Sequence, residues 1–172
     1  PGRVITVIRE QAENKRDITR RRGRMLGWRV ALGQAAFGVL HRLLAPSRAR
    51  RLEAIVVEHG LDTREHPGVA VHTVPSVNSS ECRALLASLA PSVVAVYGTR
   101  IIRSATLRAV PAPFINYHAG INPKYRGQHP GYWALVAGDR ENAGVTIHLV
   151  DAGVDTGCVL YQTPVPFAAD DT

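Results

Sequence analysis

The chain of 172 residues has little cysteine, few aromatic residues and no long hydrophobic run. Its two cysteines, Cys82 and Cys158, lie far apart in the sequence without metal-type spacing, so free thiols in a reducing compartment are expected. The alternative is a disulfide bridge between them. No stretch reaches the length of a membrane span, and no leader with a charged start and an apolar centre opens the sequence. These absences predict a cytoplasmic protein, and the length predicts a single domain over residues 1–172.

The glycine fingerprint G-x-G-x-x-G of dinucleotide-binding folds is also missing. What is present is an alternation of short β-favouring runs with helical segments. Strands are expected at residues 4–8, 69–74, 93–96, 114–118, 145–150 and 159–166, and helices at 25–44, 48–59, 82–89, 106–110 and 132–137. This order predicts an α/β fold of the Rossmann-like type, with an open, mostly parallel sheet and helices on both faces. Trp133 is expected to pack into the core.

The net charge of +7 is unevenly distributed. Thirteen of the 21 Lys and Arg residues lie in residues 1–53, so a basic helical segment is expected at about 10–53. Its Arg20–Arg22 run reads either as a solvated loop or as a phosphate-binding arm for a nucleotide-linked sugar or RNA. The apolar helix Met25–Leu44 that follows predicts packing or a homodimer contact in preference to a membrane surface, because its glycines and alanines favour close helix approach.

Polar side chains gather around Asn116 and His118, where a predicted strand ends in a glycine- and proline-rich loop. Residues two apart in a strand point to the same face, so these two side chains are expected to project together. A carboxamide donates hydrogen bonds and an imidazole moves a proton near neutral pH. The pair therefore suits a carbonyl group that develops negative charge on its oxygen. The competing interpretation is a pair that only hydrogen-bonds a turn.

A second polar loop, Asp151–Gly157, follows the predicted strand at 145–150 and carries Asp151 and Asp155. A carboxylate against His118 would fix its tautomer and raise its basicity. A metal-dependent hydrolase is the alternative from a different class of protein, because a metal ion could be held by His118, His148, Asp151 and Asp155. His148 lies mid-strand among apolar neighbours, which favours a structural role for it.

The ordered motifs N-Y-H, P-K-Y-R-G, G-V-T-I-H and D-A-G-V-D-T-G resemble the catalytic core of the 10-formyltetrahydrofolate-dependent formyltransferases over roughly residues 91–163. The resemblance implies that Asn116, His118 and Asp155 are catalytic, that 10-formyltetrahydrofolate is the co-substrate and that no metal is needed. It implies cofactor binding by Gly98, Thr99, Arg100, Ile101, Asp151, Gly153 and Val154. Residues expected to border the acceptor are Asn122, Lys124, Tyr125, Arg126 and His129.

The chain departs from the family pattern after His118. Many members have Ser-Leu-Leu-Pro there, whereas this chain has Ala-Gly-Ile-Asn-Pro, which places the polar Asn122 where an apolar residue is usual. The acceptor therefore does not follow from the resemblance. The favoured hypothesis is formyl transfer to an amine acceptor, with an amino sugar, free or linked to a nucleotide, or another small metabolite as the preferred acceptor.

Several alternatives to that function stay open. Initiator tRNA is the acceptor of a methionyl-tRNA formyltransferase, and water is the acceptor of a formyltetrahydrofolate hydrolase. An inactive module that binds folate or a partner is a further class. The chain starts at Pro1 and ends at Thr172 just after a strand-like run, so residues are expected to be missing at both ends.

Overall fold

The computed structural model describes residues 4–14, 45–64 and 67–166, together with isolated positions between 18 and 36. Contacts within the chain define two compact units, one with most residues up to Val71 and one with Ile8–Glu10 and the residues from His72 onward. The predicted Met25–Leu44 helix, its homodimer contact and the Arg20–Arg22 arm lie largely outside the described residues. No helix in the described part of the chain is long and apolar enough to cross a membrane. The single-domain organisation stays a prediction.

Helix α3, Ala45–Glu58, is the main described element of the first unit. It ends one residue before the predicted end at His59, and Gly60 beyond it adopts a left-handed backbone with φ +58°. The Leu61 N–H donates to the Val56 carbonyl at 2.9 Å, and the Gly60 N–H donates to the Val57 carbonyl at 3.2 Å. This pair of bonds is a Schellman cap, which satisfies carbonyls that the helix end leaves open.

Strands β1, Thr6–Glu10, and β2, Ala70–Val74, pair in a two-stranded sheet. The Thr6 hydroxyl donates to the Ala70 carbonyl at 2.6 Å and adds a side-chain bond to this pairing. Both strands were predicted from their β-branched residues, β1 two residues earlier than it occurs. The polar end of β1 brings Glu10 into the second unit.

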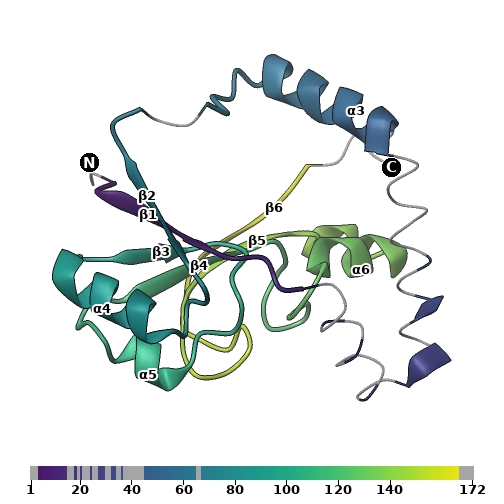
Figure 1. Ribbon diagram of the computed structural model, residues 1–172. Helices are drawn as coiled ribbons and strands as arrows, with labels where there is room; N and C mark the ends of the chain where they lie inside the picture. Colours follow the sequence, from purple (N-terminus) through teal and green to yellow (C-terminus); the bar gives the residue numbers. More distant parts are fainter. Residues whose placement is uncertain are drawn as a thin grey trace. The chain divides into compact units, whose positions relative to one another are not determined.

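The second unit is built on a four-stranded sheet in the order β3, β4, β5, β6 (Figure 1). The strands are β3, Val94–Val96; β4, Phe114–His118; β5, Gly144–Leu149; and β6, Val159–Pro164. The first pair is parallel, and the β4–β5 and β5–β6 pairs are antiparallel. The α/β class is confirmed, with mixed strand directions in the described sheet. Strand β6 lies at an edge of this sheet, a position where its Pro164 is tolerated because no ladder hydrogen bond from that residue is lost.

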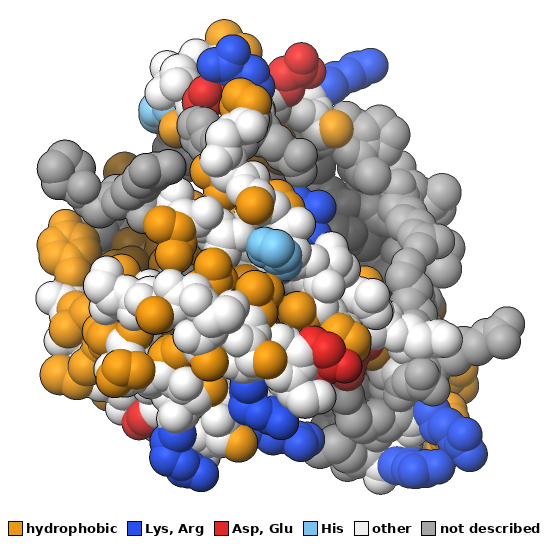
Figure 2. Space-filling model, turned by 60° about the vertical axis from the view of Figure 1, so that its left-hand side comes forward, with side chains coloured by type: hydrophobic (Ala, Val, Ile, Leu, Met, Phe, Trp, Pro, Cys, Tyr) orange, Lys and Arg blue, Asp and Glu red, His pale blue; other side chains and the backbone are white. Residues whose placement is uncertain are grey.

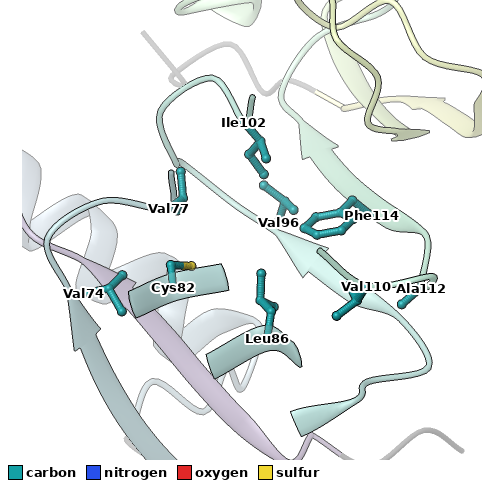
Figure 3. Close-up of a cluster of buried hydrophobic side chains, with 9 residues drawn as sticks. All are labelled: Val74, Val77, Cys82, Leu86, Val96, Ile102, Val110, Ala112 and Phe114. Atoms are coloured by element: carbon teal, nitrogen blue, oxygen red, sulfur yellow. The ribbon is translucent and has the colours of Figure 1, made fainter. Parts of the chain in front are cut away.

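Helix α4, Ser80–Leu89, precedes β3 in the chain, and the short helix α5, Ser104–Leu107, connects β3 to β4. The Ser79 hydroxyl caps α4 by accepting from the Cys82 N–H at 3.2 Å. The central hydrophobic cluster comes from α4, strands β2 to β4 and the segments that connect them (Figure 3). Its buried members are Val74, Val77, Cys82, Leu86, Val96, Ile102, Val110, Ala112 and Phe114.

Helix α6, Pro130–Val136, and the short 3-10 helix η1, Arg140–Asn142, connect β4 to β5. The prediction that Trp133 packs into the core is wrong, because this side chain is 55% exposed. Helix α6 buries only Pro130 and Ala134, which are four residues apart and therefore share one face. Trp133 lies off that face, with its ring 5.1 Å from that of Tyr132.

The surface of the described residues carries many apolar side chains. Figure 2 shows one face on which hydrophobic side chains cover a large area, while Lys and Arg side chains lie mainly near its margins. The exposed apolar residues include Tyr97, Ile101, Tyr132 and Val136.

Candidate functional site

Strand β4 presents Asn116 and His118 on one face, because side chains alternate along a strand. The intervening Tyr117 faces the other way and packs its ring 5.7 Å from that of Tyr97. Antiparallel pairing with β5 sets Asn116 opposite His148 and His118 opposite Thr146. The shared face predicted for Asn116 and His118 is confirmed, since both side chains contact the same carboxylate.

That carboxylate belongs to Asp155. Its Oδ2 lies 3.6 Å from His118 Nδ1, and its Oδ1 accepts from Asn116 Nδ2 at 3.5 Å. The Gly127 N–H donates to Oδ2 at 2.9 Å, which ties the carboxylate to the loop after β4. Asp155 has a left-handed backbone with φ +50°, a conformation that Asp tolerates better than most residues. The structure therefore brings together Asn116, His118 and Asp155, the three residues with predicted catalytic roles.

The His118 ring is buried and has an oxygen acceptor beside each nitrogen. Its Nε2 lies 2.7 Å from the Tyr125 carbonyl, and a carbonyl only accepts, so Nε2 carries hydrogen in this contact. Its Nδ1 faces Asp155. Neutral imidazole donates from one nitrogen only, whereas imidazolium donates from both. Both nitrogens of the buried ring therefore lie beside oxygen acceptors of the protein itself.

His148, for which the sequence favours a structural role, lies beside the same residues and contacts Asn116 and Asp155. Its Nδ1 lies 2.7 Å from the Leu149 carbonyl and so carries hydrogen, which leaves Nε2 as an acceptor for Asn116 Nδ2 at 3.2 Å. Nε2 also lies 3.4 Å from Asp155 Oδ1. A register irregularity in the β5–β6 pairing falls between Ile147 and His148. The antiparallel register of β4 and β5 is the signal that would have found His148, because it lies directly opposite Asn116.

Asp151 has a different task from Asp155. It accepts from the Gly153 N–H at 2.9 Å and from the Thr156 hydroxyl at 2.6 Å. The Thr156 hydrogen bond is the main reason that the pKa of Asp151 is lowered. Asp151 therefore stabilises the turn of the acidic loop. Gly153 and Val154, the other predicted cofactor residues of this loop, are exposed.

The predicted cofactor loop Gly98–Ile101 follows β3 and is fixed from inside the second unit. Gly98 has φ +62°, which a residue with a side chain rarely adopts. The Arg100 N–H donates to Glu10 Oε2 at 3.1 Å, and its guanidinium pairs with Glu10 Oε1 at 3.1 Å. The Ile101 carbonyl accepts from Asn78 Nδ2 at 3.0 Å. These bonds hold the loop while the side chain of Ile101 and Thr99 stay exposed. Because β3 pairs in parallel with β4, the loop starts beside the carboxyl end of the strand that carries Asn116.

The residues predicted to border the acceptor occupy two kinds of surroundings. Arg126 and His129 are exposed, and His129 has φ +55°. Lys124 and Tyr125 are bound to Asp139: the lysine ammonium forms an ion pair with Oδ2, and the tyrosine hydroxyl donates to it at 2.8 Å. Hydrogen bonds from Lys124, Asn142 and Tyr125 lower the pKa of Asp139 to about 2.

Asn122 is only 6% exposed, and neither side-chain polar atom has a hydrogen-bond partner. Its backbone is well bonded, since its N–H donates to the Thr146 hydroxyl at 3.2 Å and its carbonyl accepts from Gln162 Nε2 at 2.8 Å. Among the residues that the structure describes, Asn122, which departs from the family pattern, therefore carries an unsatisfied buried amide.

The part of the chain that the structure describes contains no group of three or more His, Cys, Asp or Glu side chains arranged to hold a metal ion. Of the four candidate ligands named from the sequence, Asp151 instead accepts hydrogen bonds from the Gly153 N–H and the Thr156 hydroxyl.

The fold and the site define a class: α/β proteins in which a carboxamide, an imidazole and a carboxylate meet beside the central strands. Comparison with known protein families identifies the family to which the chain belongs within that class. A model described as formyl transferase matches residues 50–172, and the chain belongs to this family.

Curated relatives with similar sequences are methionyl-tRNA formyltransferases. One from Koribacter versatilis (strain Ellin345) is 43% identical over 96 residues, which cover 55% of this chain and 30% of the relative. Another from Marinobacter nauticus (strain ATCC 700491 / DSM 11845 / VT8) is 39% identical over 128 residues, or 73% of this chain and 39% of the relative. The matched region thus spans about a third of the length of these relatives.

Solved structures agree on the fold. A phosphoribosylglycinamide formyltransferase from Streptococcus pneumoniae TIGR4 is 34% identical with a TM-score of 0.51, covering 61% of this chain and 62% of that one. A sugar N-formyltransferase from Shewanella sp FDAARGOS_354 is 18% identical with a TM-score of 0.50, covering 96% of this chain and 59% of that one. At that identity the second likeness shows the fold alone. The expected Rossmann-like α/β formyltransferase fold is confirmed.

Proposed function

We propose that this chain carries the catalytic site for transfer of a formyl group from 10-formyltetrahydrofolate to an amine. The observation that carries the proposal is the contact of Asn116 and His118 with one carboxylate, Asp155, in a member of the formyl transferase family. In the reaction the amine nitrogen forms a bond to the formyl carbon, and the bond from that carbon to the folate nitrogen breaks. One proton passes from the attacking nitrogen to the departing one.

Asn116 supplies a hydrogen-bond donor for the formyl oxygen as it gains negative charge. Its Nδ2 carries two hydrogens, one of which is directed to His148 Nε2 at 3.2 Å. The second is held only by the 3.5 Å contact with Asp155, at the long limit of a hydrogen bond. A formyl oxygen placed there accepts this hydrogen without disturbing the first bond. Such fixed donors stabilise developing charge more strongly than water does, because they need no reorganisation.

His118 holds and moves the proton. Nε2 carries hydrogen and is held by the Tyr125 carbonyl at 2.7 Å, so the lone pair of the neutral ring is on Nδ1. Nδ1 accepts a proton from the attacking nitrogen and gives it to the departing one, and Asp155, whose Oδ2 lies 3.6 Å from Nδ1, stabilises the imidazolium formed in between. A positive imidazolium close to the formyl oxygen also favours the negative charge there.

The described residues fit a reduced-folate co-substrate. The Gly98–Ile101 loop lies beside the carboxyl end of the strand carrying Asn116, where ligands bind in open α/β sheets. The acidic loop with Gly153 and Val154 carries Asp155 directly into the site. We assign the pteridine to Gly98, Thr99 and Ile101 and to the exposed backbone of the acidic loop, while Arg100 and Asp151 shape those loops through bonds within the protein.

The acceptor is an amine, and methionyl-tRNA, glycinamide ribonucleotide and an amino sugar are the three forms to test. The curated relatives at 36–43% identity are methionyl-tRNA formyltransferases, which supports the first. The exposed Arg126 and His129 suit a phosphate-bearing acceptor of any of these kinds. The matched region is about a third of those relatives, so it supports formyl transfer more directly than it supports one acceptor.

The test is to incubate the purified protein with 10-formyltetrahydrofolate and each acceptor, and to measure release of tetrahydrofolate. The proposal predicts release that depends on one amine and a formylated product of that amine. Equal release without any amine would show a hydrolase that uses water. Absence of release with every acceptor, from protein that binds the folate, would overturn the transferase.

A further inference from the structure

We propose that Asp139 is a positioning residue for His118, acting through the loop that contains Tyr125. The expected effect of Asp139 on the reaction rate rests on the proposed function, whereas its expected effect on the tautomer of the His118 ring does not. Asp139 Oδ2 accepts from the Tyr125 hydroxyl at 2.8 Å and pairs with the Lys124 ammonium, and Oδ1 accepts from Asn142 Nδ2 at 2.8 Å. One carboxylate thus binds two consecutive residues of the loop after β4.

The same loop contacts both members of the proposed proton-transfer pair. The Tyr125 carbonyl lies 2.7 Å from His118 Nε2, and the Gly127 N–H donates to Asp155 Oδ2 at 2.9 Å. The imidazole and the carboxylate are therefore each held by a backbone group of one short segment. A displacement of that segment changes the surroundings of His118 on both sides of the ring.

Asp139 is itself fixed by backbone bonds at the junction of α6 and η1. Its N–H donates to the Ala134 carbonyl at 2.9 Å, and its carbonyl accepts from the Asn142 N–H at 3.1 Å. Ala134 is fully buried, so this junction is anchored in the interior of the second unit. The contacts run from this anchor through the Asp139 carboxylate to Tyr125 and then to His118.

The connection from Asp139 to His118 is sensitive to small displacements of the loop that contains Tyr125. Between Asp139 and the His118 ring the structure places one side-chain hydrogen bond, one rigid tyrosine and one backbone carbonyl. Hydrogen bonds weaken steeply when their length and angle depart from the optimum. A misplacement of about 1 Å at a catalytic group costs on the order of a hundred-fold in rate. Loss of the Asp139 carboxylate should therefore affect the chemical step more than folate binding, since Asp139 contacts neither predicted folate loop.

The experiment compares Asp139→Ala, Asp139→Asn and Tyr125→Phe with Asp62→Ala, a matched control whose carboxylate pairs with the exposed Arg64 in the first unit. Asp139→Ala should lower kcat on the order of ten- to a hundred-fold, with KM for 10-formyltetrahydrofolate changed less than about two-fold. Asp139→Asn should recover part of the rate, because its amide oxygen still accepts from Tyr125. The control should match the wild type.

A second measurement does not depend on turnover. Nitrogen NMR of labelled His118 reports which ring nitrogen carries hydrogen, and its signals are assigned by their loss in His118→Gln. In the wild type we expect hydrogen on Nε2, and in Asp139→Ala a mixture of the two tautomers. If Asp139→Ala does not fold, Tyr125→Phe carries the same test, because it removes only the hydroxyl that Asp139 binds.

The outcomes separate the two proposals. A changed ring signal in a protein with no formyl transfer supports the positioning by Asp139 and removes the proposed function. Formyl transfer by the wild type, with unchanged kcat and an unchanged His118 signal in folded Asp139→Ala and Tyr125→Phe, overturns the positioning and leaves the proposed function standing. Equal losses of kcat in Asp139→Ala and in the Asp62→Ala control also overturn it.

Discussion

Two asparagines of the second unit differ in what their side chains contact. The Asn116 carboxamide donates to His148 and reaches Asp155, whereas the Asn122 carboxamide is buried without a partner. A buried polar group without a hydrogen bond costs free energy that an apolar group of the same shape does not. The first asparagine is therefore expected to serve chemistry at the site, and the second to lower the stability of the fold.

Asn122→Leu is expected to stabilise the protein. The substitution replaces an unsatisfied amide with an apolar side chain of similar shape and leaves the backbone bonds to Thr146 and Gln162 in place. The free energy of unfolding should rise by about 1 kcal/mol, measured by urea denaturation. Asn122→Ala is the control, since it removes the amide but leaves a cavity. A Leu variant less stable than the wild type would show that the amide has a partner in solution.

The residue scale also shows where sequence reasoning stops. Asn116, His118 and Asp155 were identified from motif order, and the strand period placed the first two on one face. The contact of His148 with Asn116 was not predicted, because the neighbours of His148 along the chain are apolar. Its relevant neighbour lies across the sheet, at Asn116, and pairing register is not visible in one strand alone.

Capping residues in the sequence mark the start of α4 and the end of α3. Helix α4 begins after the capping Ser79, two residues before the predicted start at Cys82, and α3 ends at Glu58, one residue before the predicted end at His59. Helix α5 was predicted two residues too late, because no side-chain cap marks its start. Strand β4 was predicted with its observed bounds.

Ser79→Ala tests the contribution of the α4 cap. The substitution leaves the Cys82 N–H without its side-chain acceptor and should lower the free energy of unfolding by about 1 kcal/mol. Ser88→Ala in the same helix is a suitable control, because that hydroxyl donates to the Leu85 carbonyl within the helix. The two variants are compared by thermal unfolding. Equal melting temperatures for both would contradict the role of the cap.

Gly157→Ala tests the tight approach of the acidic loop to β5. A Cβ at this position would overlap the Leu149 carbonyl, which is backbone and cannot move aside cheaply. We expect a loss of stability of about 1–3 kcal/mol and displacement of Asp155 from His118. Gly68→Ala provides a comparison, since nothing lies near its Cβ position. Wild-type unfolding and activity in Gly157→Ala would show that the loop is not packed this closely.

At the scale of the molecule, the α/β class was predictable from the alternation of strands and helices, whereas the strand directions were not. The connection through α6 and η1 returns the chain antiparallel to β4, so β5 lies beside β4 with His148 opposite Asn116. This arrangement depends on pairing between residues about thirty positions apart, which local periodicity does not encode. The mixed sheet is what completes the site.

Stability should depend on pH through Asp139. Hydrogen bonds from Lys124, Asn142 and Tyr125 lower its pKa to about 2 in the folded protein, against roughly 3.9 in an unfolded chain. Its contribution is therefore present above about pH 4 and is lost as the pH falls towards 2. Urea midpoints of wild type and Asp139→Asn should differ at pH 5 and converge near pH 2. A difference that stays constant over this range would contradict the account.

The most direct test of the central claim compares tetrahydrofolate release by wild type and Asn116→Ala, each supplied with 10-formyltetrahydrofolate and the amine that supports turnover. If Asn116 donates to the formyl oxygen beside His118 and Asp155, turnover should fall on the order of a hundred- to a thousand-fold, with little change in the melting temperature. Turnover by Asn116→Ala equal to that of the wild type would contradict the account.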